Sequence, residues 1–379
     1  MKDERKKIIA TFSIASFLND LGSDMIYPIW PLFVTVMLNA NMTVLGIIDG
    51  LGDAIVSISQ AISGYLSDKL KKRKLFIWLG YLFSSMSRIG YAISTSWLHL
   101  IPFKILDRFG KIRGSPRDAF IADVSTKYNR GSNFGLLRAM DNLGAVFGII
   151  LCILLFNILG YKKLFLLAAI PSLIAVILIL IFIKEKPSKI RINKGFSLKG
   201  LNNNLKLFLL LSAIFAIGSF SYSFLLVFAN RFGFKTTFIP VLYLIFTLIA
   251  SIFSLPFGRL ADRIGRKNVL AIAYIFWGLI CFSFIFLQNY FSIFFAFVLY
   301  GLHKGALDPA QRTFVSELSP KQYRASVLGG FQMIVGLCAL PASFIAGVLW
   351  DKFGLIFPFV FSLILTIISL ILLIVVKEK

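Results

Sequence analysis

Residues 258–270 read GRLADRIGRKNVL, and a similar basic stretch, GYLSDKLKKRK, occupies residues 64–74, so the two begin 194 residues apart. Three further residues have similar counterparts at the same offset: Arg130 and Arg324, Gly135 and Gly329, Asp123 and Glu317. Matches at one fixed spacing indicate an internal repeat, which constrains the architecture of the whole chain. The sequence therefore predicts two homologous halves with the same topology.

Composition places both halves in a membrane. Of the 379 residues, 58% are hydrophobic, and the mean hydropathy is +0.84, whereas soluble proteins contain roughly 45–50% apolar residues. The net charge of +23 would suggest nucleic-acid binding in a soluble protein. Here the cations lie between long apolar runs, so we interpret them as determinants of membrane topology. We expect the lipid bilayer as the partner, and no nucleic acid.

A helix needs about 20 mostly apolar residues to cross a bilayer core of roughly 30 Å. Charge clusters, Gly, Pro and polar turns divide the chain into twelve such spans: 8–38, 43–66, 75–95, 98–123, 132–158, 163–183, 207–230, 237–257, 268–287, 290–317, 323–349 and 355–376. We therefore expect an all-α integral membrane protein with twelve transmembrane helices in two six-helix bundles, residues 1–183 and 207–379. The basic segment 184–206 is predicted to be a cytoplasmic linker, or alternatively an amphipathic helix on the inner leaflet.

The orientation of the spans follows from the distribution of Lys and Arg between the connecting segments. With the N-terminus inside, the inner segments hold 26 of the 40 cations and the outer loops hold 5. Cytoplasmic loops of membrane proteins carry the excess of Lys and Arg. We therefore expect a multi-pass protein of the plasma membrane, a monomer, with both termini in the cytoplasm.

Residues 258–270 resemble the signature loop of the major facilitator superfamily, G-x-L-A-D-R-x-G-R-K-x-x-L, at every fixed position. The first copy, residues 64–74, keeps the Gly, Leu and Asp but has Lys71 in place of the internal Gly. The segments DRFGKIRGSPRD (107–118) and RAMD (138–141) are similar to a group of prokaryotic members whose substrates are mostly unassigned. The resemblance implies the fold of this superfamily, two pseudo-symmetric six-helix bundles, and transport of a small solute by alternating access.

The resemblance also implies a gate on the inner side. In the superfamily, the carboxylates of the two signature loops latch the closed inner gate, so we expect Asp68 to face span eleven and Asp262 to face span five. A carboxylate can stabilise the positive N-terminus of a neighbouring helix, and the alternative is that the loops only determine topology. The gating candidates are Gly64, Asp68, Gly258, Asp262, Arg263, Gly265 and Arg266.

Ionisable residues inside spans cost at least ~2.5–3.5 kcal/mol each on insertion scales, so they usually face a cavity and pair. The spans of the first half contain seven acids and seven bases, whereas the second half has few such residues. Because burial favours the neutral form of a carboxyl group, a buried acid can exchange protons. The proton-coupling candidates are Asp24, Asp20, Asp53, Asp141 and His303. Asp24 is the first choice, because it lies near mid-membrane and its repeat counterpart is Gly218; the alternative is a structural ion pair.

The substrate-cavity candidates are Tyr27, Lys104, Asp107, Arg108, Lys111, Arg138, Lys304 and Asp308. Lys104, Arg108 and Lys111 share one helix face, and span four carries a net charge of +3. By resemblance, Lys104 stands where the fourth span of the superfamily often carries a functional Arg, whereas Arg108 replaces an expected Gly. Ile149 replaces the Pro of the motif associated with antiporters.

Neither a cofactor nor a metal is indicated, because the three cysteines lack ligand spacing and no G-x-x-x-x-G-K-[ST] loop exists for ATP. The pairs Asp20/Asp24 and Asp49/Asp53 loosely resemble the Asp-rich Mg²⁺-diphosphate sites of intramembrane prenyltransferases. The accompanying bases and the twofold repeat argue against such an enzyme. The sequence therefore predicts a proton-coupled secondary transporter, antiporter or symporter, with export as the favoured direction. The alternative is an uptake carrier or facilitator for an organic anion.

Overall fold

The computed structural model describes the chain except residues 1, 71, 126–129, 185–202, 320–323 and 379. In the described residues every regular element is helical, so the predicted all-α class is confirmed. The first half contains α1 (Lys2–Asp24), α2 (Trp30–Leu32), a π-helical turn (Phe33–Met37), α3 (Met42–Leu70), α4 (Arg73–Ile93), α5 (Trp97–Phe109), a 3-10 turn (Gly110–Arg113), α6 (Gly114–Val124) and α7 (Arg130–Phe182). The second contains α8 (Asn203–Gly218), α9 (Tyr222–Phe232), a 3-10 turn (Thr236–Phe238), α10 (Ile239–Ile264), α11 (Arg266–Phe286), α12 (Tyr290–Leu318), α13 (Arg324–Phe353) and α14 (Phe357–Val375).

These helices follow the predicted spans, with breaks where the sequence requires them. Predicted spans five and six together form α7, which reverses at Gly160, where φ is 64° and ψ is −174°. Only glycine adopts this conformation without strain. Span four consists of α5, the 3-10 turn and α6, and span seven is broken between α8 and α9.

Eight described segments are long and apolar enough to cross a membrane. Neither α1, α4 nor the pair α5 and α6 is among them, because these helices carry the buried charges of the first half. A charged helix can still lie in a membrane when its polar side chains face the interior of a bundle. The charges of these helices therefore have to find partners inside the protein.

The chain forms two compact units. Unit 1 comprises residues 1–39 and 55–193, and unit 2 comprises residues 40–54 and 194–379. Helix α3 is thus shared, because its first part groups with unit 2 and the rest with unit 1.

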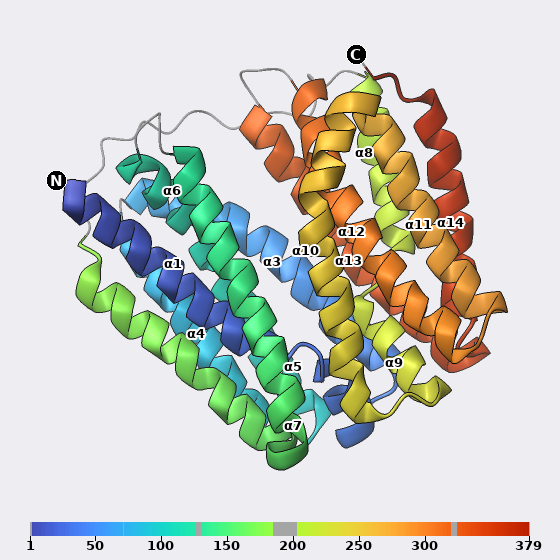
Figure 1. The fold of residues 1–379 in the computed structure, drawn as a ribbon, viewed down its shortest axis with the longest axis horizontal. Helices are drawn as coiled ribbons and strands as arrows, with labels where there is room; N and C mark the ends of the chain where they lie inside the picture. Colours follow the sequence, from blue (N-terminus) through green and yellow to red (C-terminus); the bar gives the residue numbers. More distant parts are fainter. Residues whose placement is uncertain (1, 71, 126–129, 185–202, 320–323, 379) are drawn as a thin grey trace. The chain divides into compact units, whose positions relative to one another are not determined.

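Unit 1 is built around α1, which lies along α7 (Figure 1). A Cβ atom added at Gly144 or Gly148 of α7 would lie 2.3 Å from a main-chain oxygen of α1, at Phe17 or Leu21. Small residues at this four-residue spacing let two helices approach closely. Buried residues of α1, α4, α6 and α7 form the core: Ile8, Phe12, Ala15, Ile77, Tyr81, Phe120, Ile121, Leu137, Ala175, Val176, Ile179 and Ile183.

Unit 2 has a predominantly aromatic core. The rings of Phe228 and Phe284 lie 4.6 Å apart edge to face, and those of Phe284 and Phe359 lie 4.6 Å apart and stacked. Aromatic pairs of this kind add stability beyond their buried area. Here α11 lies beside α12 and α14, and α10 beside α12 (Figure 1).

The first part of α3 packs against α13 through glycines. A Cβ atom at Gly46 would lie 2.1 Å from the oxygen of Ser343, and one at Gly347 would lie 2.5 Å from the oxygen of Met42. The carboxylate of Asp351 accepts hydrogen bonds from the amides of Met42 (3.0 Å) and Thr43 (2.7 Å). Asp351 therefore caps the N-terminus of α3.

Candidate functional site

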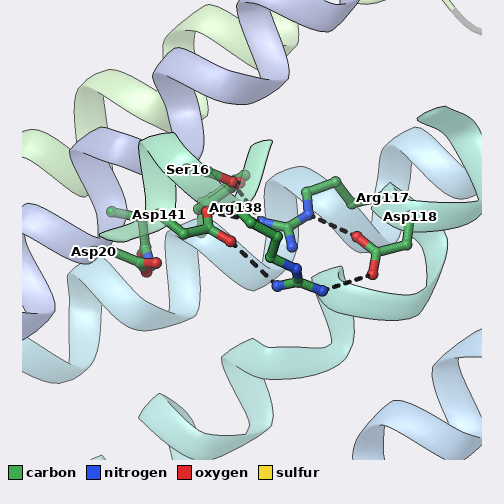
Figure 2. A network of polar contacts seen from close by, with 8 residues as sticks. Ser16, Asp20, Arg117, Asp118, Arg138 and Asp141 are labelled. Atoms are coloured by element: carbon green, nitrogen blue, oxygen red, sulfur yellow. Dashed lines mark hydrogen bonds and ion pairs between the residues drawn. The ribbon is translucent and has the colours of Figure 1, made fainter. Parts of the chain in front are cut away.

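A network of charged side chains joins α1, α6 and α7 inside unit 1 (Figure 2). Arg138 lies 3.2 Å from Asp141 and 3.4 Å from Asp118, and Arg117 lies 3.2 Å from Asp118 and 3.7 Å from Asp141. Arg117 also donates a hydrogen bond to Ser16 of α1. Two guanidinium groups and two carboxylates therefore alternate around a closed ring of ion pairs.

A third carboxylate, that of Asp20 on α1, lies next to this ring. Figure 2 shows Asp20 beside Asp141, and the two acids interact electrostatically. The Asp20 carboxylate accepts a hydrogen bond of 2.9 Å from the side-chain amide of Asn19. The five ionisable groups, Asp20, Arg117, Asp118, Arg138 and Asp141, thus carry one more negative than positive charge when all are ionised.

Arg88 of α4 is almost completely buried, and neutral oxygens hold its guanidinium group. It donates hydrogen bonds to the main-chain oxygen of Ala168 (2.7 Å) and to the hydroxyls of Ser172 and Ser23 (2.8 Å for Ser23). It also reaches the oxygens of Asn19. Among the described residues no carboxylate lies within ion-pair distance, so the positive charge of Arg88 is solvated by the protein but not neutralised.

Glycine is required where Arg88 crosses α1. A Cβ atom at Gly22 would lie 2.1 Å from Nη1 of Arg88 and 2.3 Å from the oxygen of Ala168. These distances are far shorter than van der Waals contact, so a larger residue would displace the guanidinium or separate α1 from α7. Arg88 was not among the predicted site residues, because its acceptors are neutral polar groups that form no charge pattern in the sequence.

The span-four cations pack against aromatic rings of the first span. The ammonium of Lys104, which is buried, lies 3.9 Å from the ring centroid of Trp30. Arg108 lies over the ring of Tyr27 at 5.3 Å and 3.7 Å from the carboxylate of Asp107. Such cation–π contacts stabilise a cation that has lost its water. These four predicted cavity residues and Trp30 thus form one cluster inside unit 1.

The other predicted residues of the first half differ in burial and in position. Lys111 is half-buried, and Asp24 is buried on α1. Arg138 is 58% exposed and belongs to the ring of ion pairs. Asp53 is exposed and lies on the part of α3 that groups with unit 2.

In unit 2, Lys304 interacts electrostatically with Asp308 and Asp53, and His303 with Lys304. His303 is completely buried, and its Nδ1 lies 2.8 Å from the oxygen of Ala273. Because a carbonyl only accepts, Nδ1 carries the hydrogen, and Nε2 has no hydrogen-bond partner in the described structure. Lys304 lies 5.8 Å from the ring centroid of Tyr300, and Asp308 is exposed.

The second signature loop forms an ion-pair cluster. Arg266 lies 2.9 Å from Asp262 and 2.9 Å from Glu317 at the end of span ten. In the first unit, Arg73 pairs in the same way with Asp123 at the end of span four. The internal repeat is therefore visible in the structure as well, as an equivalent ion pair in each half.

The remaining gating residues differ in their surroundings. A Cβ atom at Gly64 would lie 3.3 Å from Ser115, whereas none of the described atoms lies within 4 Å of that position at Gly258. Gly265 has a φ of 96°, which disfavours larger residues, and Arg263 is exposed. The side chain of Asp68 lies outside the described part of the structure.

The comparisons with known proteins agree with this architecture. The sequence pattern of the Major Facilitator Superfamily matches residues 12–253 and 207–379. An uncharacterized MFS-type transporter of Methanocaldococcus jannaschii is 40% identical over 379 aligned residues, 97% of this chain and 94% of that protein. The chain therefore belongs to the major facilitator superfamily, a family of multi-pass membrane transporters, as the signature loop predicted.

Other similar proteins are more distant. The tetracycline resistance protein, class H, of Pasteurella multocida is 24% identical over 70% of each chain. The structure of the nucleoside transporter NupG covers 98% of this chain and 100% of its own, with a TM-score of 0.81 and 18% identity. That of a D-xylose-proton symporter covers 98% of each chain, with a TM-score of 0.78 and 14% identity. At these identities the two structures confirm the fold alone.

Proposed function

We propose that this chain is a proton-coupled secondary transporter that moves a small solute across the plasma membrane by alternating access, with both termini in the cytoplasm. The observation that carries the proposal is the group of three carboxylates and two guanidinium groups between α1, α6 and α7. With every group ionised, these five side chains carry one excess negative charge, and all of them except Arg138 are at least half-buried. A single bound proton makes the group neutral.

Asp20 is the acid best placed to take that proton. Asp118 and Asp141 each lie next to two arginines, whereas Asp20 accepts a hydrogen bond from the neutral amide of Asn19. Asp20 also interacts electrostatically with Lys111, Arg88 and Asp141. Alternating access changes the surroundings of Asp20, and so couples a change of shape to a change of protonation.

Asp24, the first choice from the sequence, becomes the second candidate. It lies one helical turn beyond Asp20 on α1 and is buried, but the ring of ion pairs does not include it.

The experiment is a proteoliposome screen for substrates, with and without an imposed pH gradient. The panel includes tetracycline and a quinolone, because resistance proteins for both drugs are among the similar proteins. Once a substrate is found, Asp20→Asn should abolish gradient-driven accumulation and leave substrate counterflow, which needs alternation but no net proton movement. The counterflow rate of the same variant is its matched control. Full gradient-driven accumulation in both Asp20→Asn and Asp24→Asn would contradict the proposed coupling site.

Export is the direction that we favour, because drug resistance requires removal of the drug from the cell. The drug-resistance relatives support this direction for the present chain. In inside-out vesicles, export predicts uptake driven by a proton gradient directed out of the vesicle lumen. Accumulation by right-side-out vesicles under an inward gradient would instead indicate a symporter.

The second candidate function is an uptake carrier or facilitator for an organic anion. The spans of unit 1 contain seven cations and five acids, and in the described structure no carboxylate lies within ion-pair distance of Arg88. This excess positive charge favours a substrate that brings its own negative charge. Transport that organic anions inhibit, and that a pH gradient leaves unchanged, would support this function over the first.

A further inference from the structure

The end of the described chain folds back onto the second signature loop. After α14, the carboxylate of Glu378 accepts hydrogen bonds from the main-chain amides of Arg266 and Lys267, the latter at 3.2 Å. These two amides are the first of α11, where no partner within the helix is available. Glu378 therefore caps α11 from another helix.

Side chains of α8 and α11 in turn bind the main chain that follows α14. Lys267 donates from its ammonium group to the main-chain oxygens of Ile374 (2.7 Å) and Val376 (2.9 Å). Asn204, at the start of α8, exchanges two hydrogen bonds with the main chain of Lys377, at 2.6 and 2.9 Å. Residues 376–378 thus join the ends of α8, α11 and α14, all within unit 2.

The charges explain why α11 needs this cap. A helix N-terminus carries a partial positive charge, and cations in the first turn are unfavourable there. Helix α11 nevertheless begins with Arg266 and Lys267, and its N-cap residue, Gly265, has no side chain to offer. Glu378 supplies the missing negative charge. A Cβ atom at Gly265 would lie 2.6 Å from the Glu378 carboxylate, so a larger residue there would displace this carboxylate from the amides that it caps.

The position of Arg266 connects the cap to the gate. The main-chain amide of Arg266 is bound by Glu378, and its side chain pairs with Asp262 and Glu317. The hydrogen bond from Glu378 to the Arg266 amide therefore fixes the main chain from which the Arg266 guanidinium reaches Asp262 and Glu317.

A similar set of residues occurs in the first half of the sequence. VKEK at 376–379 has a counterpart, IKEK, at 183–186, an offset of 193 residues. The same offset carries Arg73 and Lys74 onto Arg266 and Lys267. In unit 1, Lys74 donates to the oxygen of Leu180 at the end of α7, as Lys267 does at the end of α14. Residues 185 and 186 lie outside the described part of the chain.

We propose that residues 376–378 form a strap that fixes the second signature loop to unit 2, with Glu378 as the positioning residue for Arg266. The strap makes the loop move with α8 and α14, so that the ion pairs of Arg266 follow the whole bundle. The role in gating rests on the proposed transport by alternating access, whereas the positioning itself does not.

The test compares Glu378→Gln with Lys377→Ala in the full-length protein in detergent micelles. Lys377 is the matched control, because its hydrogen bonds in the described structure involve only its main chain. Amide hydrogen exchange is followed in peptides that cover residues 265–270. Glu378→Gln should speed exchange at Arg266 and Lys267 roughly 5- to 30-fold, the factor that corresponds to losing a charged helix cap. Glu378→Asp, which restores the charge, should recover part of the protection.

A second readout detects movement of the loop. A nitroxide is attached at Arg263→Cys, an exposed position, in a variant without the three native cysteines. Its spectrum should show greater mobility with Glu378→Gln and no change with Lys377→Ala.

Two outcomes overturn the proposal: unchanged exchange at residues 266 and 267 in Glu378→Gln, or an equal increase throughout unit 2, which reports only lower global stability. Neither readout needs a substrate. Failure to find transport would therefore count against the proposed function and leave this result intact.

Discussion

Replacing glycine by alanine at two positions of α13 should change stability in opposite directions. A Cβ atom at Gly347 would lie 2.5 Å from both the Met42 oxygen and the Thr43 Cα atom, whereas none of the described atoms lies within 4 Å of it at Gly330. Both glycines lie in the interior of the same helix. The substitution is therefore chemically identical at the two sites and differs only in its surroundings.

The magnitudes follow from these distances. In a helix interior, alanine is more favourable than glycine by about 1 kcal/mol, so Gly330→Ala should raise the free energy of unfolding by up to that amount. At Gly347 the same gain is opposed by overpacking, which costs roughly 1–3 kcal/mol in a tight interior. The neighbours are main-chain atoms that cannot rotate away. Moving α3 outward by about 1 Å to make room also stretches the Asp351 cap, which is worth ~1 kcal/mol.

The assay is thermal unfolding of the purified protein in detergent micelles. Gly347→Ala should lower the unfolding midpoint and Gly330→Ala should leave it unchanged or raise it. Ser343→Ala is a useful third variant, because it removes the Ser343 hydroxyl without adding volume to the contact between α3 and α13. Equal shifts of the same sign for the two glycine variants would refute the packing of α3 against α13 that the glycine distances describe.

Two further predictions concern topology and the ring of ion pairs. A cysteine at Lys235 should react with an impermeant reagent from outside intact cells, and one at Arg263 only after permeabilisation; the reverse pattern would overturn the proposed orientation. Arg117→Gln and Asp141→Asn should each destabilise unit 1, and the double variant should be less destabilised than the two effects added together, by about 0.5–3 kcal/mol. Strict additivity in thermal unfolding would mean that the 3.7 Å contact between them carries no energy.

Much of the fold could be predicted from the sequence, because apolar spans and an internal repeat are visible along the chain. The repeat and the apolar runs predicted the span order, and the signature loop at residues 258–270 predicted the family. The same repeat marked Asp123 and Glu317 as equivalent residues. The structure shows why, since each pairs with an arginine of its signature loop, Arg73 or Arg266.

The contacts of the candidate site were less accessible. Asp118 and Arg138 are 20 residues apart and meet only because α6 and α7 pack together. The acceptors of Arg88 come from Asn19, Ser23 and Ser172, which are ordinary polar residues without a charge pattern. Contacts between side chains of different helices depend on how each helix is rotated about its own axis relative to its neighbours. The spacing of residues along the sequence does not determine that rotation.

The placement of charge also bears on how a transporter of this kind can move. A buried ion pair is costly to break, because each partner is left uncompensated in a medium of low dielectric constant. The ring of Arg117, Asp118, Arg138 and Asp141 lies within one compact unit. A movement of that unit as a rigid body leaves the four pairs intact and incurs no such cost. In the proposed mechanism, Asp20 carries the charge in excess and takes up or releases the coupling proton when its environment changes.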